Sequence, residues 1–205
     1  MISVVKYNNF DIEKLSIENV DFTKIKNKSK PYKFISIQYE DKPLYLETPK
    51  MHCPFGVNNF EGSDRYNISF NLVEDMENII LTIEDKIVNH IYENQMKYFS
   101  KNAFKLSNLK ELFNSSIKIN QNKNYSNLFK CQLDNADSDL YDRKTGEEME
   151  ITKENTMNTK IQSIIRIPGF YIMNKMYGIS YKIDQMLLDK NDNTNDKIFL
   201  FTDDI

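Results

Sequence analysis

Apolar residues repeat at two different periods along this chain, and the two-residue period dominates. A residue that alternates with polar neighbours marks a strand with one buried face. The alternating runs are Ile35, Ile37 and Tyr39; Tyr66, Ile68, Phe70 and Leu72; Phe129, Cys131 and Leu133; and Tyr177, Ile179, Tyr181, Ile183 and Leu187. A single stretch, about residues 75–99, instead places isoleucines at positions 80, 83, 87 and 91, the spacing of one long amphipathic helix, with Glu84 on its polar face. The pattern predicts an α+β fold that is mainly β.

Turn and stop signals divide the strands. Pro168-Gly169 is predicted to end a strand over 161–167, and Asn174-Lys175-Met176 to turn a final hairpin. Ser107 is the predicted cap of a second, short helix. Seven or eight short strands with one inserted helix fit an OB-fold-like small barrel, a partly open Greek-key architecture. We expect one OB-like domain over 1–188 with an N-terminal extension, followed by a polar linker and tail over 189–205.

Composition excludes several classes of protein. The length of 205 residues suits one domain with a real core. Two cysteines, Cys53 and Cys131, form no disulfide framework and no metal motif. Neither a signal peptide nor a run of ~20 apolar residues is present in the sequence, so we expect an intracellular protein that is not secreted and contacts no membrane.

Positive charge is concentrated although the chain is acidic overall, with a formal net charge of -3. Residues 97–130 hold seven lysines and one acid, Glu111, interleaved with aromatic residues, and a second lysine block lies at 24–33. Lysines can track phosphates and rings can stack on unpaired bases. The candidate nucleic-acid-binding residues are Lys24, Lys26, Lys28, Lys30, Tyr32, Lys33, Tyr66, Lys105, Lys110, Lys118, Lys123, Tyr125 and Lys130. A solvated surface is the alternative for any lysine run, and Tyr98, Phe99, Leu109 and Phe113 are expected in the core.

No catalytic site can be assembled from the sequence. His52 and His90 are the two histidines, and neither has the metal-ligating or nucleophilic partners at the spacing that catalysis needs. We therefore expect no enzyme activity, no cofactor and no metal.

The chain ends in a short apolar and acidic tail: Phe199, Phe201, Asp203, Asp204 and Ile205. Such a tail can dock on partner proteins or lie in the protein's own basic groove, and the alternative is a last edge strand with a frayed end.

Two segments resemble a known family. The run from Pro43 to Val57, which contains Thr48-Pro-Lys-Met-His-Cys-Pro-Phe-Gly56, is similar to a signature of single-stranded-DNA-binding proteins of large nucleo-cytoplasmic DNA viruses. The run from Phe170 to Leu187 and the ending Phe201-Thr-Asp-Asp204 are similar to the final hairpin and the ending of that group. The group resembles the OB-fold single-stranded-DNA-binding proteins of tailed phages. The resemblance implies cooperative coating of unpaired DNA in replication and recombination, and a tail that contacts replication proteins.

The sequence thus predicts a non-enzymatic, largely sequence-independent single-stranded-DNA-binding protein of viral origin, in a host cytoplasm, viral factory or nucleus. RNA binding and a homodimer stay open. The alternative is a structural or virion-associated interaction module that binds no nucleic acid, and a small hydrolase or nuclease is the third.

Overall fold

The computed structural model describes residues 3–19, 32–59, 66–99, 104–133, 138–174 and 176–189. Its strands are β1 (Val4–Lys6), β2 (Leu15–Ile17), β3 (Tyr32–Tyr39), β4 (Lys42–Glu47), β5 (Met51–Cys53), β6 (Asn58–Asn59), β7 (Tyr66–Asn71), β8 (Ile117–Lys118), β9 (Leu128–Leu133), β10 (Asp139–Asp142), β11 (Glu148–Met149), β12 (Thr159–Met173) and β13 (Met176–Asp189). Its α-helices are α1 (Glu74–Glu93), α2 (Gln95–Phe99), α3 (Leu106–Leu112) and α4 (Lys153–Thr156), and 3-10 turns lie at Tyr7–Asn9 and Ile12–Lys14. The prediction of a mainly-β α+β fold is confirmed.

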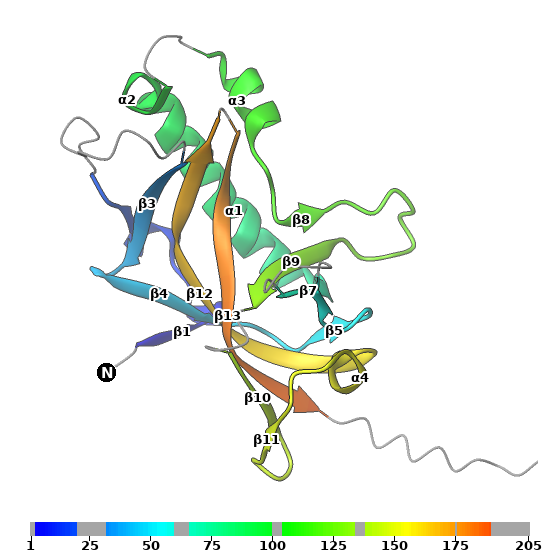
Figure 1. Ribbon diagram of the computed structural model, residues 1–205. Helices are drawn as coiled ribbons and strands as arrows, with labels where there is room; N and C mark the ends of the chain where they lie inside the picture. Colours follow the sequence, from blue (N-terminus) through cyan, green and yellow to red (C-terminus); the bar gives the residue numbers. More distant parts are fainter. Residues whose placement is uncertain are drawn as a thin grey trace, which may run out of the picture.

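The long β12–β13 hairpin runs through the whole sheet (Figure 1). One edge of β12 pairs in turn with β5, β4 and β3. The far edge of β13 pairs with β10 and β9, and β9 pairs with β7. The path of strands is β1-β4-β3-β12-β13-β9-β7-β6.

Between its two ends the sheet is open over the described residues. β5 and β7 approach each other, and the amide nitrogen of Asn71 lies 3.2 Å from Nδ1 of His52. No ladder joins these two strands in the described part of the chain. Closure into a small barrel, as the OB-fold prediction requires, is therefore not confirmed.

Bulges in the hairpin correct two predictions. Register shifts lie between Ile164 and Ile165 and between Arg166 and Gly169 of β12. Pro168 sits in the second shift, where a missing N–H breaks no ladder bond, so β12 continues to Met173 and the predicted stop at 168–169 is wrong. On β13 an extra residue between Ile183 and Gln185 reverses the alternation, so Met186 and Leu188 are buried in place of Leu187.

Helices α1, α2 and α3 cover the inner face of the sheet, whereas α4 lies at the start of β12 (Figure 1). α1 lies behind the tip half of the hairpin in Figure 1, and its isoleucines at 80, 83, 87 and 91 are fully buried. The predicted helix over 75–99 is interrupted at Asn94, which separates α1 from α2. Two contacts join the helices to the hairpin. The ring of His90 on α1 packs edge-on against Phe170 of β12. The Tyr177 hydroxyl of β13 donates a hydrogen bond to the Leu109 carbonyl of α3 at 2.9 Å.

Two further predictions about the helices are wrong. Glu84 belongs to the buried side of α1, not to its polar face, because it binds polar groups of the chain after α3. Ser107 does not cap α3, since the helix starts at Leu106 and its N-cap, Lys105, makes no side-chain capping bond. The expected core positions of Tyr98 and Leu109 are confirmed at 2% and 0% exposure, and Phe99 and Phe113 pack against the core.

Candidate nucleic-acid interface

The outer face of the sheet carries polar and basic side chains in register across five strands. Residues that pair directly on neighbouring strands point to the same face. One such row is Tyr45 on β4, Arg166 on β12, Lys182 on β13, Gln132 on β9 and Asn67 on β7. A shorter row beside it pairs Lys130 with Ser69. The residues that alternate with them, such as Ile165, Ile183 and Cys131, are buried, so the rows face solvent.

Two aromatic residues lie on the same face near the hairpin tip, where β3, β12 and β13 meet. Tyr171 pairs with Phe34 on one side and with Gly178 on the other. A methyl group added at Gly178 would lie 2.8 Å from both the Asn114 carbonyl oxygen and the Tyr171 hydroxyl oxygen. One added at Gly169 would lie 2.0 Å from the Ile35 carbonyl oxygen and 2.9 Å from the ring of Phe34. Each ring therefore lies close to a glycine, and a side chain at either position would also collide with the backbone of Ile35 or Asn114.

Beside these rows the face is hollowed. A cavity of about 160 Å³ opens between β9, β13 and the segment that joins α3 to β8, and it is lined by Asn67, Asn114, Ser115, Ser116, Lys118, Lys130, Gln132, Tyr171, Ile179 and Tyr181. A neighbouring cavity of about 330 Å³ is lined by Asn58, Asn59, Asn67, Ser69, Lys118 and Lys130. Three residues line both, so together the cavities form one groove, which we name the amide groove. Among the described residues its lining has two charged side chains, both lysine, and no carboxylate.

A buried carboxylate supports one wall of the amide groove from below. Glu84 on α1 is 6% exposed and accepts hydrogen bonds from the Ser115 hydroxyl at 2.9 and 3.0 Å and from the Ser116 N–H at 3.3 Å. Burial raises the pKa of Glu84, and these two donors offset part of the rise. The carboxylate fixes the chain that leads into β8, and with it the position of Lys118.

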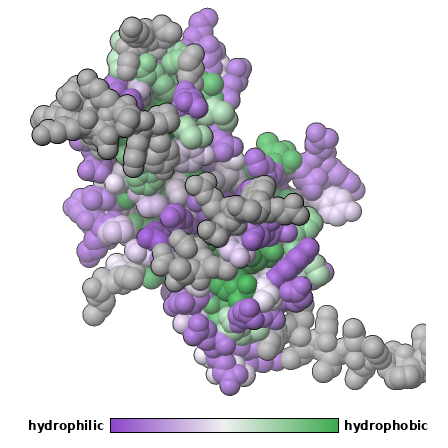
Figure 2. All heavy atoms as spheres, viewed as in Figure 1, coloured by the Kyte–Doolittle hydropathy of each residue, from purple (hydrophilic) through white to green (hydrophobic). Residues whose placement is uncertain are grey.

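The loop between β8 and β9 projects from the molecule, and its side chains are mostly hydrophilic apart from the exposed Ile119 (Figures 1 and 2). Asparagine carboxamides order it: the backbone N–H groups of residues 120, 122 and 124 donate to the side chains of Asn127, Asn120 and Asn122 at 3.0–3.1 Å. The Asn127 amide then donates to Glu77 of α1 at 2.7 Å. The loop presents Tyr125, 66% exposed, in a defined position.

The structure brings some of the predicted lysines together. Lys118 and Lys130 share the amide groove, and Lys123 and Tyr125 lie on the loop that follows β8. Lys105 and Lys110 lie at α3, where Lys110 is 3.7 Å from Asp85 of α1.

Other predicted residues take different places. Lys33 donates to the Tyr98 carbonyl at 2.7 Å, and burial lowers its pKa. Tyr66 packs partly against the core. The side chains of Lys24, Lys26, Lys28, Lys30 and Tyr32, and the tail residues Phe199, Phe201, Asp203, Asp204 and Ile205, lie outside the described residues.

Several groove residues were missed because each looks ordinary in the sequence. Asn67 and Gln132 are the polar members of alternating runs, and an alternating run by itself indicates only which residues are buried. Arg166 and Lys182 join the same row only through cross-strand register. The polar half of each alternating run, compared between strands, is the signal that could have found them.

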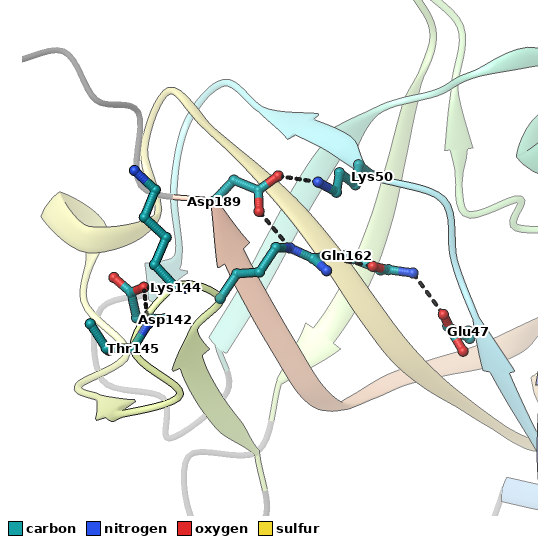
Figure 3. Close-up of polar contacts among 8 residues, drawn as sticks. Glu47, Lys50, Asp142, Lys144, Thr145, Gln162 and Asp189 are labelled. Carbon is teal, nitrogen blue, oxygen red and sulfur yellow. Dashed lines mark hydrogen bonds and ion pairs between the residues drawn. The ribbon is translucent and has the colours of Figure 1, made fainter.

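A second polar cluster lies at the open end of the hairpin (Figure 3). Asp189, the last described residue, is 2.6 Å from Lys50 and 2.5 Å from Arg143. Arg143 donates to Gln162 at 2.6 Å, and Gln162 donates to Glu47 at 2.7 Å. We name Glu47, Lys50, Arg143, Gln162 and Asp189 the exit network, because the described part of the chain ends there.

The described residues contain neither a group of three or more potential metal ligands nor a helix long and apolar enough to cross a membrane.

Comparisons with known proteins identify the fold. No protein-family model matches the chain, and no curated protein matches it in sequence. Among solved structures, the chain is similar to the single-stranded DNA-binding protein from bacteriophage Enc34, with a TM-score of 0.50 and 16% identity over 82% of this chain and 92% of that one. It also matches gp2.5, a single-stranded DNA-binding protein encoded by bacteriophage T7, with a TM-score of 0.48 and 10% identity over 71% of this chain and 91% of that one. The likeness to the Enc34 protein shows that the two chains share a fold.

Proposed function

We propose that this chain is a non-enzymatic protein that binds single-stranded DNA along the outer face of its sheet, largely independently of sequence. The observation that carries the proposal is the amide groove, where Lys118 and Lys130 lie among neutral polar side chains with no carboxylate in the described lining. Lysine contributes point charges to phosphates without the bidentate reading of bases that arginine offers. The Enc34 protein, which shares this fold, is by its name a single-stranded DNA-binding protein.

The path of the strand follows from the placement of charge and rings. Phosphates contact Lys118 and Lys130 in the groove and Lys182 in the row beside it, and Tyr125 on the projecting loop stacks on a base. The lysines at 24–33 extend the same positive surface in this proposal. The approach of β5 to β7 supports an OB-like organisation, because one hydrogen bond already connects the two strands that would close the barrel.

The biological setting is proposed from the sequence resemblance. The chain acts in viral DNA replication and recombination inside the host cell, and residues 189–205 contact replication proteins.

Fluorescence anisotropy with a labelled oligo-dT of about 16 nucleotides, the upper end of the ~4–16 nucleotide site of one OB-fold, tests the proposal. We expect binding that weakens with salt, with a log–log slope of about -0.7 for each phosphate contact. Duplex DNA of the same length is the matched competitor and should bind more weakly. Absence of binding at ~50 mM salt, or equal affinity for the duplex, would contradict the proposal and favour an interaction module without nucleic acid.

A further inference from the structure

A buried acid lies directly beneath the amide groove. Glu84 of α1 is 6% exposed, and its carboxylate accepts hydrogen bonds from the Ser115 hydroxyl at 2.9 and 3.0 Å and from the Ser116 N–H at 3.3 Å. Both serines line the smaller cavity of the groove, the one of about 160 Å³. A single hydrogen bond therefore separates the Glu84 carboxylate from residues that line the groove.

Among the described residues, no cation pairs with this carboxylate. Its hydrogen-bond partners are Ser115 and Ser116, and the charged neighbour that acts on it is Asp85 of the same helix, a second acid. On β13, burial raises the pKa of the Tyr181 hydroxyl, and the neighbouring Glu84 and Cys131 raise it further. Burial, the largest cause, and Asp85 raise the pKa of Glu84 against the two serine donors. The protein thus favours the neutral form of this carboxyl group more than water does.

The groove side of the same wall carries the cations that the proposed function uses. Lys118 and Lys130 line the cavity together with the two serines. A strand whose phosphates contact these lysines places negative charge in front of the wall that Glu84 supports from behind. A like charge disfavours the ionised form of a carboxyl group, so a bound phosphate favours protonation of Glu84.

The hydrogen bonds of Glu84 do not oppose this effect. They are made within the protein, with and without DNA, and a neutral carboxyl group can still accept from Ser115 or Ser116. Their contribution therefore largely cancels between the free and the bound protein. The repulsion between carboxylate and phosphate exists only in the complex, so the strand binds more tightly to the protein with a neutral Glu84.

We propose that Glu84 couples DNA binding to the uptake of a proton from solvent, which one oxygen of its carboxylate receives as phosphates enter the amide groove. The proposal rests on the proposed function and adds regulation by pH to the same groove.

The test compares the pH profiles of oligo-dT affinity for the wild type and Glu84→Gln. Where Glu84 is ionised, the variant should bind about three- to fifteen-fold more tightly, the range for two unit charges roughly 10 Å apart at an effective dielectric constant of ~20, with and without screening by salt. The two affinities should converge as pH falls toward the ordinary glutamate value of ~4.3. A carboxylate that only holds the wall predicts that the variant binds equally or more weakly at every pH.

Glu93→Gln is the matched control. It removes the same charge from the same helix, but Glu93 is exposed and does not line the groove. Solvent and salt screen its charge, so affinity should stay within about two-fold of the wild type across the pH range. Urea unfolding verifies that both variants are folded at each pH.

A measurement on the wild type avoids dependence on any variant. Calorimetric titration with oligo-dT in phosphate and in Tris, which differ in ionisation enthalpy, counts the protons taken up on binding. The wild type should take up a fraction of one proton more than Glu84→Gln does, and Glu93→Gln should match the wild type. A wild type that binds oligo-dT without proton uptake at any pH from about 5 to 8, or parallel pH profiles of the wild type and Glu84→Gln, would overturn the coupling and leave the proposed function standing. If the wild type binds no single strand, both proposals fail.

Discussion

The amide groove and the exit network place positive charge in opposite surroundings. In the exit network, Lys50 and Arg143 both contact the carboxylate of Asp189 within 2.6 Å (Figure 3). In the amide groove, Lys118 and Lys130 lie among carboxamides and hydroxyls, and no carboxylate belongs to the described lining. The surroundings of the cationic side chains therefore indicate a different role at each site. In the exit network the cations cross-link strands within the protein. In the amide groove they lie where the proposed function places the phosphates of a DNA strand.

The largest expected effect on DNA affinity comes from replacing charged side chains by neutral glutamine in the amide groove. The groove variant Lys118→Gln with Lys130→Gln removes two charge-assisted contacts, worth ~1.5–3 kcal/mol each, so affinity for oligo-dT should fall by about 100-fold or more. The log–log salt slope should become shallower by about 1.4, because two phosphate contacts are lost. Anisotropy titrations at several salt concentrations measure both quantities.

The matched control makes the same change in the exit network. Lys50→Gln with Arg143→Gln should leave DNA affinity within about two-fold and lower the free energy of unfolding by ~1 kcal/mol, because partly exposed ion pairs contribute little. Urea unfolding measures the second effect. If the exit variant weakens DNA binding as much as the groove variant does, the distinction between the two sites is wrong.

A smaller effect is expected at the projecting loop. Tyr125→Ala should reduce oligo-dT affinity by about ten-fold, because a base stacked on an aromatic ring contributes ~1–3 kcal/mol. The ordered asparagine loop should survive the change, since its hydrogen bonds use backbone N–H groups and the side chains of asparagines. Anisotropy titration with oligo-dT measures the loss.

Tyr92→Ala provides the comparison for the loop. Tyr92 is 41% exposed on α1, which covers the inner face of the sheet, so its removal should leave binding unchanged. Equal losses in the two variants would show that Tyr125 acts through general surface properties and not through stacking.

The fold could be predicted from the sequence wherever apolar residues kept one spacing, that of a helix or of a strand, along the whole element. The isoleucines of α1 and the alternation of β7 and β9 placed their buried faces correctly. The prediction failed on the hairpin, where one extra residue reversed the face of Leu187 and where Pro168 sits in a bulge that leaves β12 intact. A bulge depends on the partner strand, and the local pattern of a single strand does not contain that information.

The candidate site was only partly predictable for a related reason. A lysine run in the sequence pointed to Lys118 and Lys130, which the structure places in one groove. Their neighbours Gln132, Asn67 and Lys182 come from three strands and meet through register alone. Lys33, from the second lysine block, donates to the Tyr98 carbonyl, a contact between β3 and α2 that charge counting cannot reveal.

The smallest expected effect concerns the carboxylates of the two sites, which respond to pH in opposite directions. Burial raises the pKa of Glu84 beneath the amide groove, so the folded state binds its proton more tightly than the unfolded chain does. The resulting contribution to stability is complete below the unfolded value of ~4.3 and is lost as pH rises through the folded pKa. Burial alone would also raise the pKa of Asp189 in the exit network, but Lys50 and Arg143 outweigh it and lower the pKa. The contribution of Asp189 to the free energy of unfolding is present above its pKa in the unfolded chain, ~3.9, and is lost as pH falls through its pKa in the folded protein.

Urea unfolding of the wild type, Glu84→Gln and Asp189→Asn between acidic and neutral pH tests this opposition. Relative to the wild type, Glu84→Gln should gain stability as pH rises, because the neutral amide no longer pays for burying a charge and can still accept from Ser115 or Ser116. Asp189→Asn should lose stability relative to the wild type over the same range, because the wild type gains its ion pairs as Asp189 ionises. Difference curves of the same sign would contradict the assignment. Opposite signs would support one buried carboxylate that holds the wall of the groove and one carboxylate, at the far end of the hairpin, that neutralises the cations around it.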